Sequence, residues 1–358
     1  MKITKPVQIA GLAMTGALAL AACSSGGSSN ADNISCTTGS IKASGSTAQK
    51  NAMADWVNAY QGACSGATIN YQANGSGAGI QDFNNAQTSF AGSDSAIKDA
   101  DLTAANKRCA TGNAINLPMV GGAIVAAYNV SGVSKLTLTS SALAGIFNGK
   151  ITKWNNSEIA SANPGVTLPD ATIVQFHRSD SSGTTDNFTN YLKTAAPSTW
   201  TSGSGKDWVA AGGQGSKGND GVSASVKSTP NSIGYVELSF AQTQNLSMAS
   251  IDNGGGAVAP TAETGSTAIG LATVSNVNNN ITLKMDYATK NPAAYPLVLV
   301  TYEITCQKGL PSDQEGLTKS FLTYTSGTAA QGKLGSSGYV PLPSSLQTQV
   351  ATAVGSIS

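Results

Sequence analysis

Residues 172–192 read TIVQFHRSDSSGTTDNFTNYL, and they predict a strand, a polar loop and a helix in direct succession. The apolar run TIVQF is typical of a buried strand, and Phe188, Tyr191 and Leu192 have the spacing of one helix face. The loop RSDSSGTT (178–185) supplies a guanidinium fork, an aspartate that could hold the fork, and several hydroxyl groups. Guanidinium forks bind oxyanions bidentately, and the first N–H groups of a helix attract anions. The stretch therefore predicts an oxyanion-binding loop.

Three other strand-like runs also end in small polar clusters, which read GST (45–47), GSG (75–77) and SDS (93–95). Ligands of open α/β sheets bind beyond the carboxyl ends of the strands, where such clusters would lie. Any one of them could be only a helix cap or a turn, and that is the usual role of Ser-Asp-Ser. Four clusters in one chain favour a shared binding site.

Strand-like and helix-like segments alternate along the chain, which favours an α/β architecture with parallel sheets. The stripe of Met53, Trp56 and Tyr60 is interpreted as core, and KGNDG (217–221) as a turn into a helix rather than a nucleotide loop. We expect strands at 40–43, 68–72, 89–92, 117–128, 172–176, 232–236 and 297–304, and helices around 53–60 and 80–83.

The charge balance excludes several classes of function. Lys and Arg number 20 and Asp and Glu 19, which gives a formal net charge of +1, so the chain lacks a basic surface for nucleic acid. Charged residues make up 11% of the chain, below the usual share of about 25%, and this suits an exported protein. His177 is the only histidine, which excludes a multi-histidine metal site. We expect no metal and no cofactor.

The N-terminus predicts export and anchoring. Residues 1–22 have a basic start and a small apolar stretch, as in a secretory signal peptide. They end in Leu-Ala-Ala before Cys23, which resembles the bacterial lipobox, in which the cysteine carries acyl chains such as palmitate. Residues 23–35 would then be a lipidated flexible tether rich in Ser and Gly. The alternative is ordinary cleavage after Ala22.

Four cysteines remain after the predicted cleavage, and an even number in an exported chain indicates two disulfides. Three pairings are open from the count alone. Cys36 and Cys64 each precede a strand-like run, and the starts of two parallel neighbouring strands lie close together. We therefore expect the pairs Cys36–Cys64 and Cys109–Cys306.

The loop RSDSSGTT resembles the phosphate-binding signature of the substrate-binding proteins of phosphate ABC transporters, the PstS family. The similarity continues collinearly over most of the mature chain, which makes it far more specific than a single Gly-rich loop. The other matching segments are GSTA (45–48), YQ followed by GSG (71–77), FAGSD (90–94), LAGIFNGKITKW (143–154), KGNDG (217–221) and IGYVE (233–237).

This resemblance implies a two-lobed, periplasmic-binding-protein-like α/β fold (type II) with the ligand cleft between the lobes. Lobe one would comprise residues 36–119 and 297–358, and lobe two residues 120–296, with crossings near Val120 and Pro296. Ligand binding would close the hinge between the lobes, and the permease would recognise the closed form.

The resemblance also implies a set of ligands drawn from both lobes. Asp180 would orient Arg178, and Ala48 would contribute its backbone N–H, although family members commonly carry an aromatic residue at that position. The implied phosphate ligands are Thr47, Ala48, Ser76, Asp94, Arg178, Ser182, Gly183 and Thr184.

Asp94 is expected to select the anion. Phosphate near neutral pH keeps at least one proton, whereas sulfate keeps none. An ionised carboxylate can only accept hydrogen bonds, so Asp94 can accept the phosphate proton and can only repel sulfate. The charge of Asp94 also offsets that of Arg178, so affinity must come mainly from hydrogen bonds and helix N-termini.

The predicted function is that of a lipid-anchored, monomeric receptor on the extracytoplasmic side of the cell membrane. It would bind inorganic phosphate and deliver it to the permease subunits and ATPase of an ABC transporter. The alternatives are a secreted phosphatase or serine hydrolase using Ser76 or Ser182, a structural or adhesive surface protein, and a receptor for another tetrahedral oxyanion such as sulfate. A hydrolase needs a base beside its nucleophile, and adjacent strand residues such as His177 and Arg178 face opposite ways. We therefore do not expect an enzyme.

Overall fold

The computed structural model describes residues 34–109 and 111–358. The expected signal peptide, Cys23 and most of the expected tether lie outside these residues. Ile34, within the expected tether, is buried, and the Ser35 carbonyl accepts a hydrogen bond from Ser320 Oγ, so the folded body begins by Ile34. In the described part of the chain, no helix has both the length and the apolar character needed to span a membrane.

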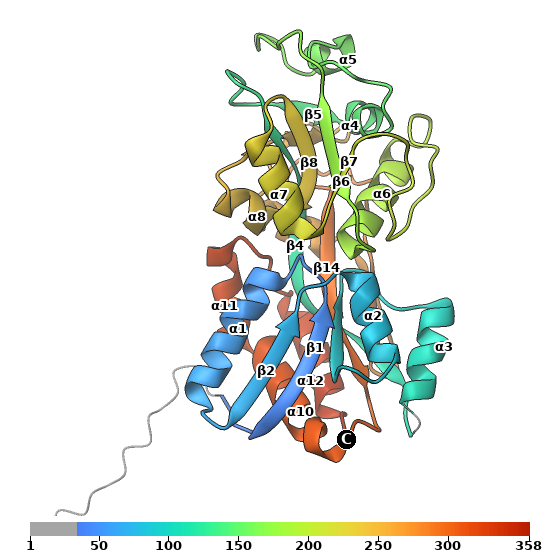
Figure 1. The fold of residues 1–358 in the computed structure, drawn as a ribbon, viewed down its shortest axis with the longest axis vertical. Coiled ribbons are helices and arrows are strands. Elements are labelled where there is room, and N and C mark those ends of the chain that lie inside the picture. The colour runs from blue at the N-terminus through green and yellow to red at the C-terminus, as the bar shows by residue number, and fades with distance from the viewer. Residues whose placement is uncertain (1–33, 110) are drawn as a thin grey trace, which may run out of the picture. The chain divides into compact units, whose positions relative to one another are not determined.

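Figure 1 shows the elements in two groups that share two long strands. We call residues 36–119 with 297–358 lobe one and residues 120–296 lobe two, and these boundaries remain the prediction made from the sequence. Lobe one contains β1 (Gly39–Gly45), α1 (Lys50–Ala63), β2 (Ala67–Gln72), α2 (Ser76–Asn84), β3 (Phe90–Ser93), α3 (Asp99–Arg108), β14 (Val298–Cys306), α10 (Ser312–Ser326), α11 (Thr328–Lys333), the 3-10 helix η1 (Leu334–Ser337) and α12 (Ser344–Gly355).

Strand β4 (Ala114–Asn129) begins in lobe one and ends in lobe two. Lobe two also contains β5 (Thr137–Thr139), α4 (Ser140–Phe147), α5 (Ser157–Ser161), β6 (Val174–Arg178), α6 (Gly183–Ala195), β7 (Gln214–Ser216), α7 (Gly218–Ser228), β8 (Ser232–Glu237), α8 (Leu238–Thr243), β9 (Ser247–Met248), β10 (Ser250–Asp252), β11 (Ala257–Val258), α9 (Ala262–Gly270), β12 (Thr273–Val277) and β13 (Asn280–Lys284).

The main sheet follows the order β2-β1-β3-β14-β4-β8-β6-β7. Strands β1, β2 and β3 are parallel to one another, as are β6, β7 and β8. Helices α2 and α10 both pack on β1, so the lobe-one sheet is enclosed by helices (Figure 1). The predicted stripe of Met53, Trp56 and Tyr60 is buried on α1, which confirms that it belongs to the core.

Strands β4 and β14 connect the two lobes. The first part of β4 pairs antiparallel with β14, and its last part, from Ile124 to Asn129, pairs antiparallel with β8. Strand β14 is also antiparallel to β3. The expectation of parallel sheets is therefore wrong for these two strands. The chain enters lobe two along β4 and returns along β14, so the two neighbours must run in opposite directions. The expected crossing near Val120 falls within β4, and Pro296 lies just before β14.

Both predicted disulfides are confirmed. The Cys36–Cys64 bond joins the chain just before the parallel strands β1 and β2, whose first residues Gly39 and Ala67 are paired in the sheet. The Cys109–Cys306 bond joins the end of α3 to the end of β14 and closes a loop with a sequence separation of 197 residues. Strand β4, all of lobe two and most of β14 lie inside that loop. The bond therefore connects the segment where the chain leaves lobe one with the segment where it comes back.

Removal of the longer disulfide should cost more stability than removal of the shorter one. The chain-entropy model attributes stabilisation to the loop closed in the unfolded chain, and separations of 28 and 197 residues give a difference of about 1.5–2 kcal/mol. We expect Cys109→Ala/Cys306→Ala to unfold at lower urea than Cys36→Ala/Cys64→Ala, measured on both double variants side by side. Equal free energies of unfolding would contradict this expectation.

Candidate anion-binding site

Three lobe-one loops meet at the carboxyl ends of the parallel strands β1, β2 and β3. Ser46 N–H donates to the Gly92 carbonyl at 2.7 Å, and Gly75 N–H donates to the Gly45 carbonyl at 2.8 Å. Gly45 has φ +136°, and a Cβ at this position would lie 2.0 Å from the Gly92 carbonyl oxygen. Only glycine allows this approach, so the first polar cluster depends on its glycine for backbone contact as well as for conformation.

Asp94 lies just beyond β3 and is 3% exposed. Its Oδ1 accepts hydrogen bonds from Ser46 Oγ and, at 2.8 Å, from Thr301 Oγ1, while its Oδ2 accepts from Thr184 Oγ1 at 3.1 Å. Asp94 N–H donates to Ser76 Oγ at 3.2 Å. Burial raises the pKa of Asp94, and the hydroxyl hydrogen bonds and the charge of Arg178 oppose this rise. The carboxylate therefore acts as an acceptor on both oxygens, surrounded by hydroxyl donors.

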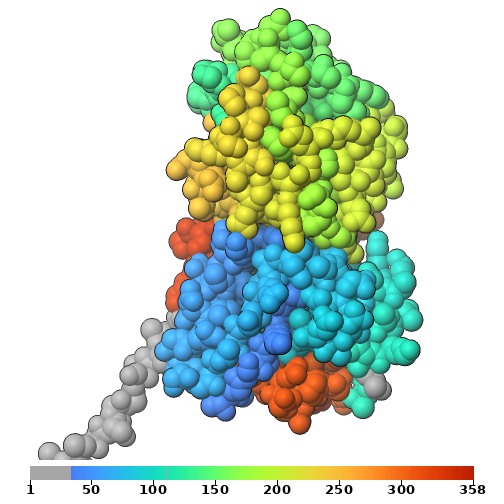
Figure 2. Space-filling model, viewed as in Figure 1, coloured from blue at the N-terminus to red at the C-terminus, as the bar shows by residue number. Residues whose placement is uncertain are grey.

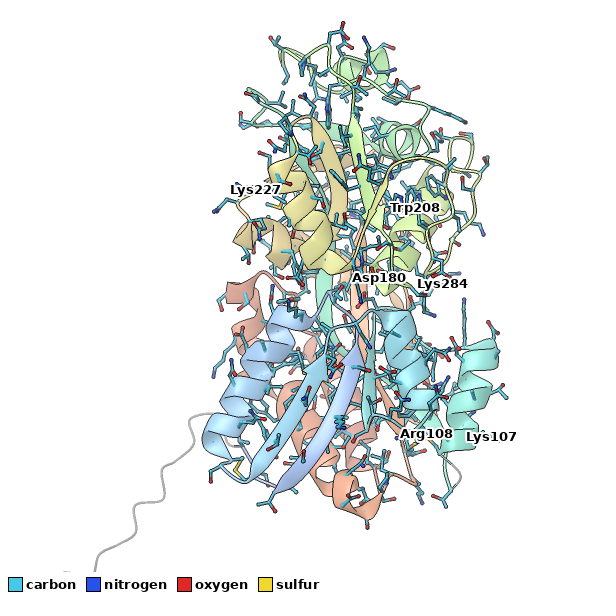
Figure 3. All side chains as sticks on the ribbon, in the orientation of Figure 1. Lys107, Arg108, Asp180, Trp208, Lys227 and Lys284 are labelled. Carbon is cyan, nitrogen blue, oxygen red and sulfur yellow. A yellow bond between two sulfur atoms is a disulfide. The ribbon has the colours of Figure 1, made fainter. Side chains whose placement is uncertain are left out.

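Arg178 ends β6 with its side chain only 1% exposed. Its Nε donates to Asp180 Oδ1 at 2.7 Å and its Nη2 to Asp180 Oδ2, which is the bidentate arrangement of a guanidinium with a carboxylate. Asp180 also accepts from Gly218 N–H at 3.0 Å. Burial raises the pKa of Asp180, but the hydrogen bonds and charge of Arg178 outweigh it, and the net pKa lies below the usual range. Figure 3 labels Asp180 between α7 above and α2 below.

The remaining nitrogen of the guanidinium faces the start of α6. Arg178 Nη1 lies 3.4 Å from Thr184 Oγ1, so the hydroxyl of Thr184 stands between Arg178 and Asp94. Arg178 N–H donates to Tyr235 Oη at 3.1 Å, which fixes the end of the strand. The predicted cation and the predicted anion of the site are thus linked through one lobe-two hydroxyl.

Helix α6 begins at Gly183, with Ser182 as its N-cap. Ser182 Oγ accepts from Thr185 N–H at 3.2 Å. The N–H groups of Gly183 and Thr184 are in the first helical turn, where no preceding helix carbonyl is available to accept from them. A Cβ on Gly183 would lie 2.6 Å from Asp94 Cβ and 2.7 Å from Ser76 Oγ. Glycine at this position lets the lobe-two helix start lie directly against lobe one.

The first loop meets lobe two through Thr47 and Asn219. Thr47 Oγ1 accepts from Asn219 Nδ2 at 2.9 Å and from Asn219 N–H at 3.3 Å, which leaves the hydroxyl proton of Thr47 free to donate elsewhere. Ala48 N–H, an implied phosphate ligand, donates to Ser46 Oγ at 3.0 Å. The Ala48 N–H is therefore already hydrogen-bonded within its own loop.

Further contacts hold the lobes together. Gly77 N–H donates to the Ser181 carbonyl at 3.0 Å, Asn187 Nδ2 donates to the Asp94 carbonyl at 2.7 Å, and Lys50 and Asp220 form an exposed ion pair at 2.9 Å. In Figure 2 the yellow-green residues of lobe two lie directly on the blue and cyan residues of lobe one. The site residues are accordingly buried.

Sequence reasoning missed three contributors. Ser46 lies inside the quoted GST cluster, and nothing in that cluster indicates that its hydroxyl donates to Asp94. Asn219 lies in KGNDG, which does form the predicted turn into a helix, now seen as α7. Thr301 lies in the apolar run LVLVTYEIT, where no local pattern separates it from other strand residues.

His177 packs against Trp208 and the backbone of Arg178. Its ring stacks on Trp208 with centroids 4.7 Å apart, and its Nδ1 lies 3.0 Å from the Arg178 carbonyl oxygen. Burial lowers the pKa of His177. Within residues 34–109 and 111–358, no group of three His, Cys, Asp or Glu side chains is placed to hold a metal ion.

Comparisons with known proteins agree on one family. A PBP superfamily domain matches residues 30–328. Phosphate-binding protein PstS 3 of Mycobacterium tuberculosis (strain ATCC 25618 / H37Rv) is 45% identical over 375 residues, covering 100% of both chains. Phosphate-binding protein PstS 2 of the same strain is 39% identical over 374 residues, again covering 100% of both.

Solved structures share the fold. A high affinity periplasmic phosphate-binding protein bound with phosphate superposes with a TM-score of 0.68 at 22% identity, covering 87% of this chain and 93% of that one. This likeness supports the two-lobed α/β fold expected from the sequence.

Asp180→Ala should destabilise the protein, because it leaves the Arg178 guanidinium buried without its carboxylate. Removal of one partner of a buried pair costs about 3–5 kcal/mol. Urea unfolding of Asp180→Ala, Arg178→Met and the double variant would measure the coupling between the two side chains. We expect the double variant to recover most of the loss seen in Asp180→Ala. If Asp180→Ala is as stable as wild type, Asp180 does not hold Arg178 in solution.

Proposed function

The chain belongs to the phosphate-binding PstS proteins of the PBP superfamily, and on that premise we propose that it is a receptor that binds inorganic phosphate for an ABC transporter. The observation that carries this proposal is the convergence of Asp94 and Arg178, each almost fully buried, on the hydroxyl of Thr184. Like its relatives, which are phosphate-binding proteins, the chain is a binding protein and not an enzyme. The ring of His177, the one histidine of the sequence, stacks on Trp208.

The proposed phosphate ligands supply mainly hydrogen-bond donors. Arg178 would bind through the edge of its guanidinium that Asp180 leaves open, and Gly183 and Thr184 through the N–H groups of the first turn of α6. Hydroxyl donors would come from residues whose acceptor sites are already occupied, as in Thr47. The full proposed set is Thr47, Ala48, Ser76, Asp94, Arg178, Ser182, Gly183 and Thr184. Ala48 would first have to release its N–H from Ser46 Oγ.

Asp94 gives the site its proposed selectivity. Its two oxygens already accept from hydroxyl groups, and a carboxylate has no proton to offer a fully ionised anion. Sulfate would therefore face an unpaired negative charge in a buried site, which is costly. Phosphate can donate its remaining proton to Asp94.

Titration calorimetry with phosphate and with sulfate tests the function directly. We expect phosphate binding by the wild-type protein and no measurable sulfate binding. In Asp94→Asn, phosphate binding should weaken but persist, and the phosphate-to-sulfate affinity ratio should fall by tenfold or more, because the amide offers a donor and removes the repulsion.

Two results would count against this assignment. An unchanged affinity ratio in Asp94→Asn would mean that Asp94 only caps its turn. Absence of phosphate binding by the wild-type protein would overturn the receptor function itself. Thr348→Ser, an exposed helix position far along the chain, is a suitable control for handling of the variants.

We propose that Cys23 is diacylated and anchors a monomer to the extracytoplasmic side of the cell membrane, where it serves the permease subunits and ATPase of the transporter. The lipobox-like sequence before Cys23 and the following Ser/Gly-rich segment support this. Lobe one and lobe two would open and close about β4 and β14 to admit and retain phosphate.

Cys23→Ser should abolish anchoring. We expect the variant to appear in the medium or to keep its signal peptide, and we expect mass spectrometry of the wild-type N-terminus to find acyl chains on Cys23. A wild-type protein cleaved before an unmodified Cys23 would contradict the anchor and leave phosphate binding untouched.

A further inference from the structure

Glu237 is a buried carboxyl at the boundary between the lobes. It ends β8 with no exposed surface, and its N–H donates to Asn219 Oδ1 at 2.9 Å. Its Oε2 accepts from Ser239 N–H at 2.9 Å and lies 2.5 Å from Ser239 Oγ. Its Oε1 has no hydrogen-bond partner among the described residues. The proposed binding function gives this side chain no role.

A series of hydrogen bonds leads from Glu237 to the lobe-one loop that carries Thr47 and Ala48. Ser239 Oγ lies 3.0 Å from Tyr339 Oη, and Tyr339 Oη donates to the Ala48 carbonyl at 2.7 Å. Asn51 Nδ2 donates to Ser239 Oγ at 3.0 Å. Glu237 and Ser239 belong to lobe two, whereas the other three residues belong to lobe one. This series of hydrogen bonds therefore forms only when the two lobes are in contact.

The hydroxyl protons of Tyr339 and Ser239 are too few to serve all the contacts in this series. The Ala48 carbonyl can only accept, so the Tyr339 proton is committed to it. The contact between Ser239 and Tyr339 then needs the single proton of Ser239. With that proton used, the short contact between Ser239 Oγ and Glu237 Oε2 is a hydrogen bond only if Glu237 supplies a proton. All three contacts are made at once only by the neutral acid.

The surroundings of Glu237 favour the same form. Burial is the largest cause that raises the pKa of Glu237 to about 8, the charge of Asp94 adds to it, and the hydrogen bonds from Ser239 oppose it. The titratable groups that face Glu237 are Asp94, beyond β3, and Tyr339, beyond η1. Strand β4 contributes Gly122, where a Cβ would lie 3.2 Å from Glu237 Oε1.

We propose that Glu237 is a positioning residue that must carry a proton for the lobes to close on phosphate, so that phosphate binding takes up a proton at this carboxyl. The inference rests on the proposed receptor function. When the lobes separate, Glu237 loses the cover of lobe one and Ser239 loses Tyr339, so the carboxyl ionises more readily. Through Tyr339 and Ala48, the neutral acid holds the loop that carries Thr47.

The sign of the pH dependence follows from linkage. The closed form binds the proton more tightly than the open form, so the contribution of Glu237 to affinity is complete below the open-form pKa. It is lost progressively as pH rises, and the loss levels off above the closed-form pKa of about 8. Phosphate itself also ionises in this range, and a comparison with a variant removes that effect.

Glu237→Gln tests the proposal because the carboxamide is neutral at every pH. Ser239 N–H and Ser239 Oγ both contact Oε2, so the amide keeps one of the two: an oxygen there accepts from Ser239 N–H, or an NH2 there donates to Ser239 Oγ. Calorimetry with inorganic phosphate at pH 6, 7 and 8, in buffers of different ionisation enthalpy, gives both Kd and protons taken up. We expect the ratio of wild-type Kd to variant Kd to rise about tenfold or more from pH 6 to pH 8, since each unit of pKa shift is tenfold. We also expect smaller proton uptake in the variant.

Tyr339→Phe provides a second, independent test, because it breaks this series of hydrogen bonds while Glu237 remains. It should weaken phosphate binding at pH 6 and reduce the proton uptake. Tyr191→Phe is the matched control, since it removes a buried hydroxyl whose hydrogen bond to Asn253 Oδ1, at 2.7 Å, stays inside lobe two. It should leave both quantities at wild-type values.

Three outcomes would overturn the inference. A Kd ratio for Glu237→Gln that does not change with pH, with wild-type proton uptake, would show that Glu237 is not the linked group. Weaker binding of phosphate by Glu237→Gln at pH 6 by tenfold or more would show that a neutral group at this position does not support closure. Tyr339→Phe and Tyr191→Phe that behave alike would remove the proposed route. In each case phosphate binding by the wild-type protein would still support the receptor function.

Discussion

The antiparallel pairing of β4 with β14 is the constraint on which the two-lobed structure and its site depend. The pairing runs without a break from Cys306 opposite Ala114 to Tyr302 opposite Pro118. It shifts there, because Met119 is an extra residue, and continues from Thr301 opposite Val120 to Val298 opposite Ala123. Proline has no N–H to give to a neighbouring strand, so an irregularity beside it costs little. The strand presents Thr301 to Asp94 at this point, which makes a strand shared by both lobes a direct support of the site.

The electrostatics of the lobe boundary explain why hydrogen bonds must dominate binding. Arg178 is already neutralised by Asp180, so it offers donor geometry more than free charge. Asp94 adds a negative charge, and two more buried carboxyls, Glu237 and Glu303, each have a pKa raised to about 8 by burial and by Asp94. In the neutral form that a raised pKa favours, these two acids would not add to the repulsion of an anion by Asp94. The arrangement suits a chain with very few charged residues and a net charge near zero.

Much of the fold was predictable because its signals are local. The polar clusters follow strands, the α1 stripe has helical spacing, and the starts of β1 and β2 indicate the Cys36–Cys64 pairing. The direction of β4 and β14 was not predictable from their apolar runs, because a strand buried on both faces shows no pattern that depends on its neighbours. For the site, Arg178 and Asp180 are close in sequence, whereas Thr301 and Asn219 reach Asp94 and Thr47 only through tertiary packing. Nothing in LVLVTYEIT or KGNDG indicates those partners.

The Cys109–Cys306 bond gives lobe two an unusual mechanical position. Tension applied between the two ends of the chain would travel along lobe one to α3, cross directly to the end of β14 through the sulfur atoms, and continue to α12. Lobe two would lie in the covalent loop that the disulfide closes, outside the path that carries the tension. In a protein pulled at its N-terminus, residues 110–305 would therefore lie outside the covalent path that carries the tension.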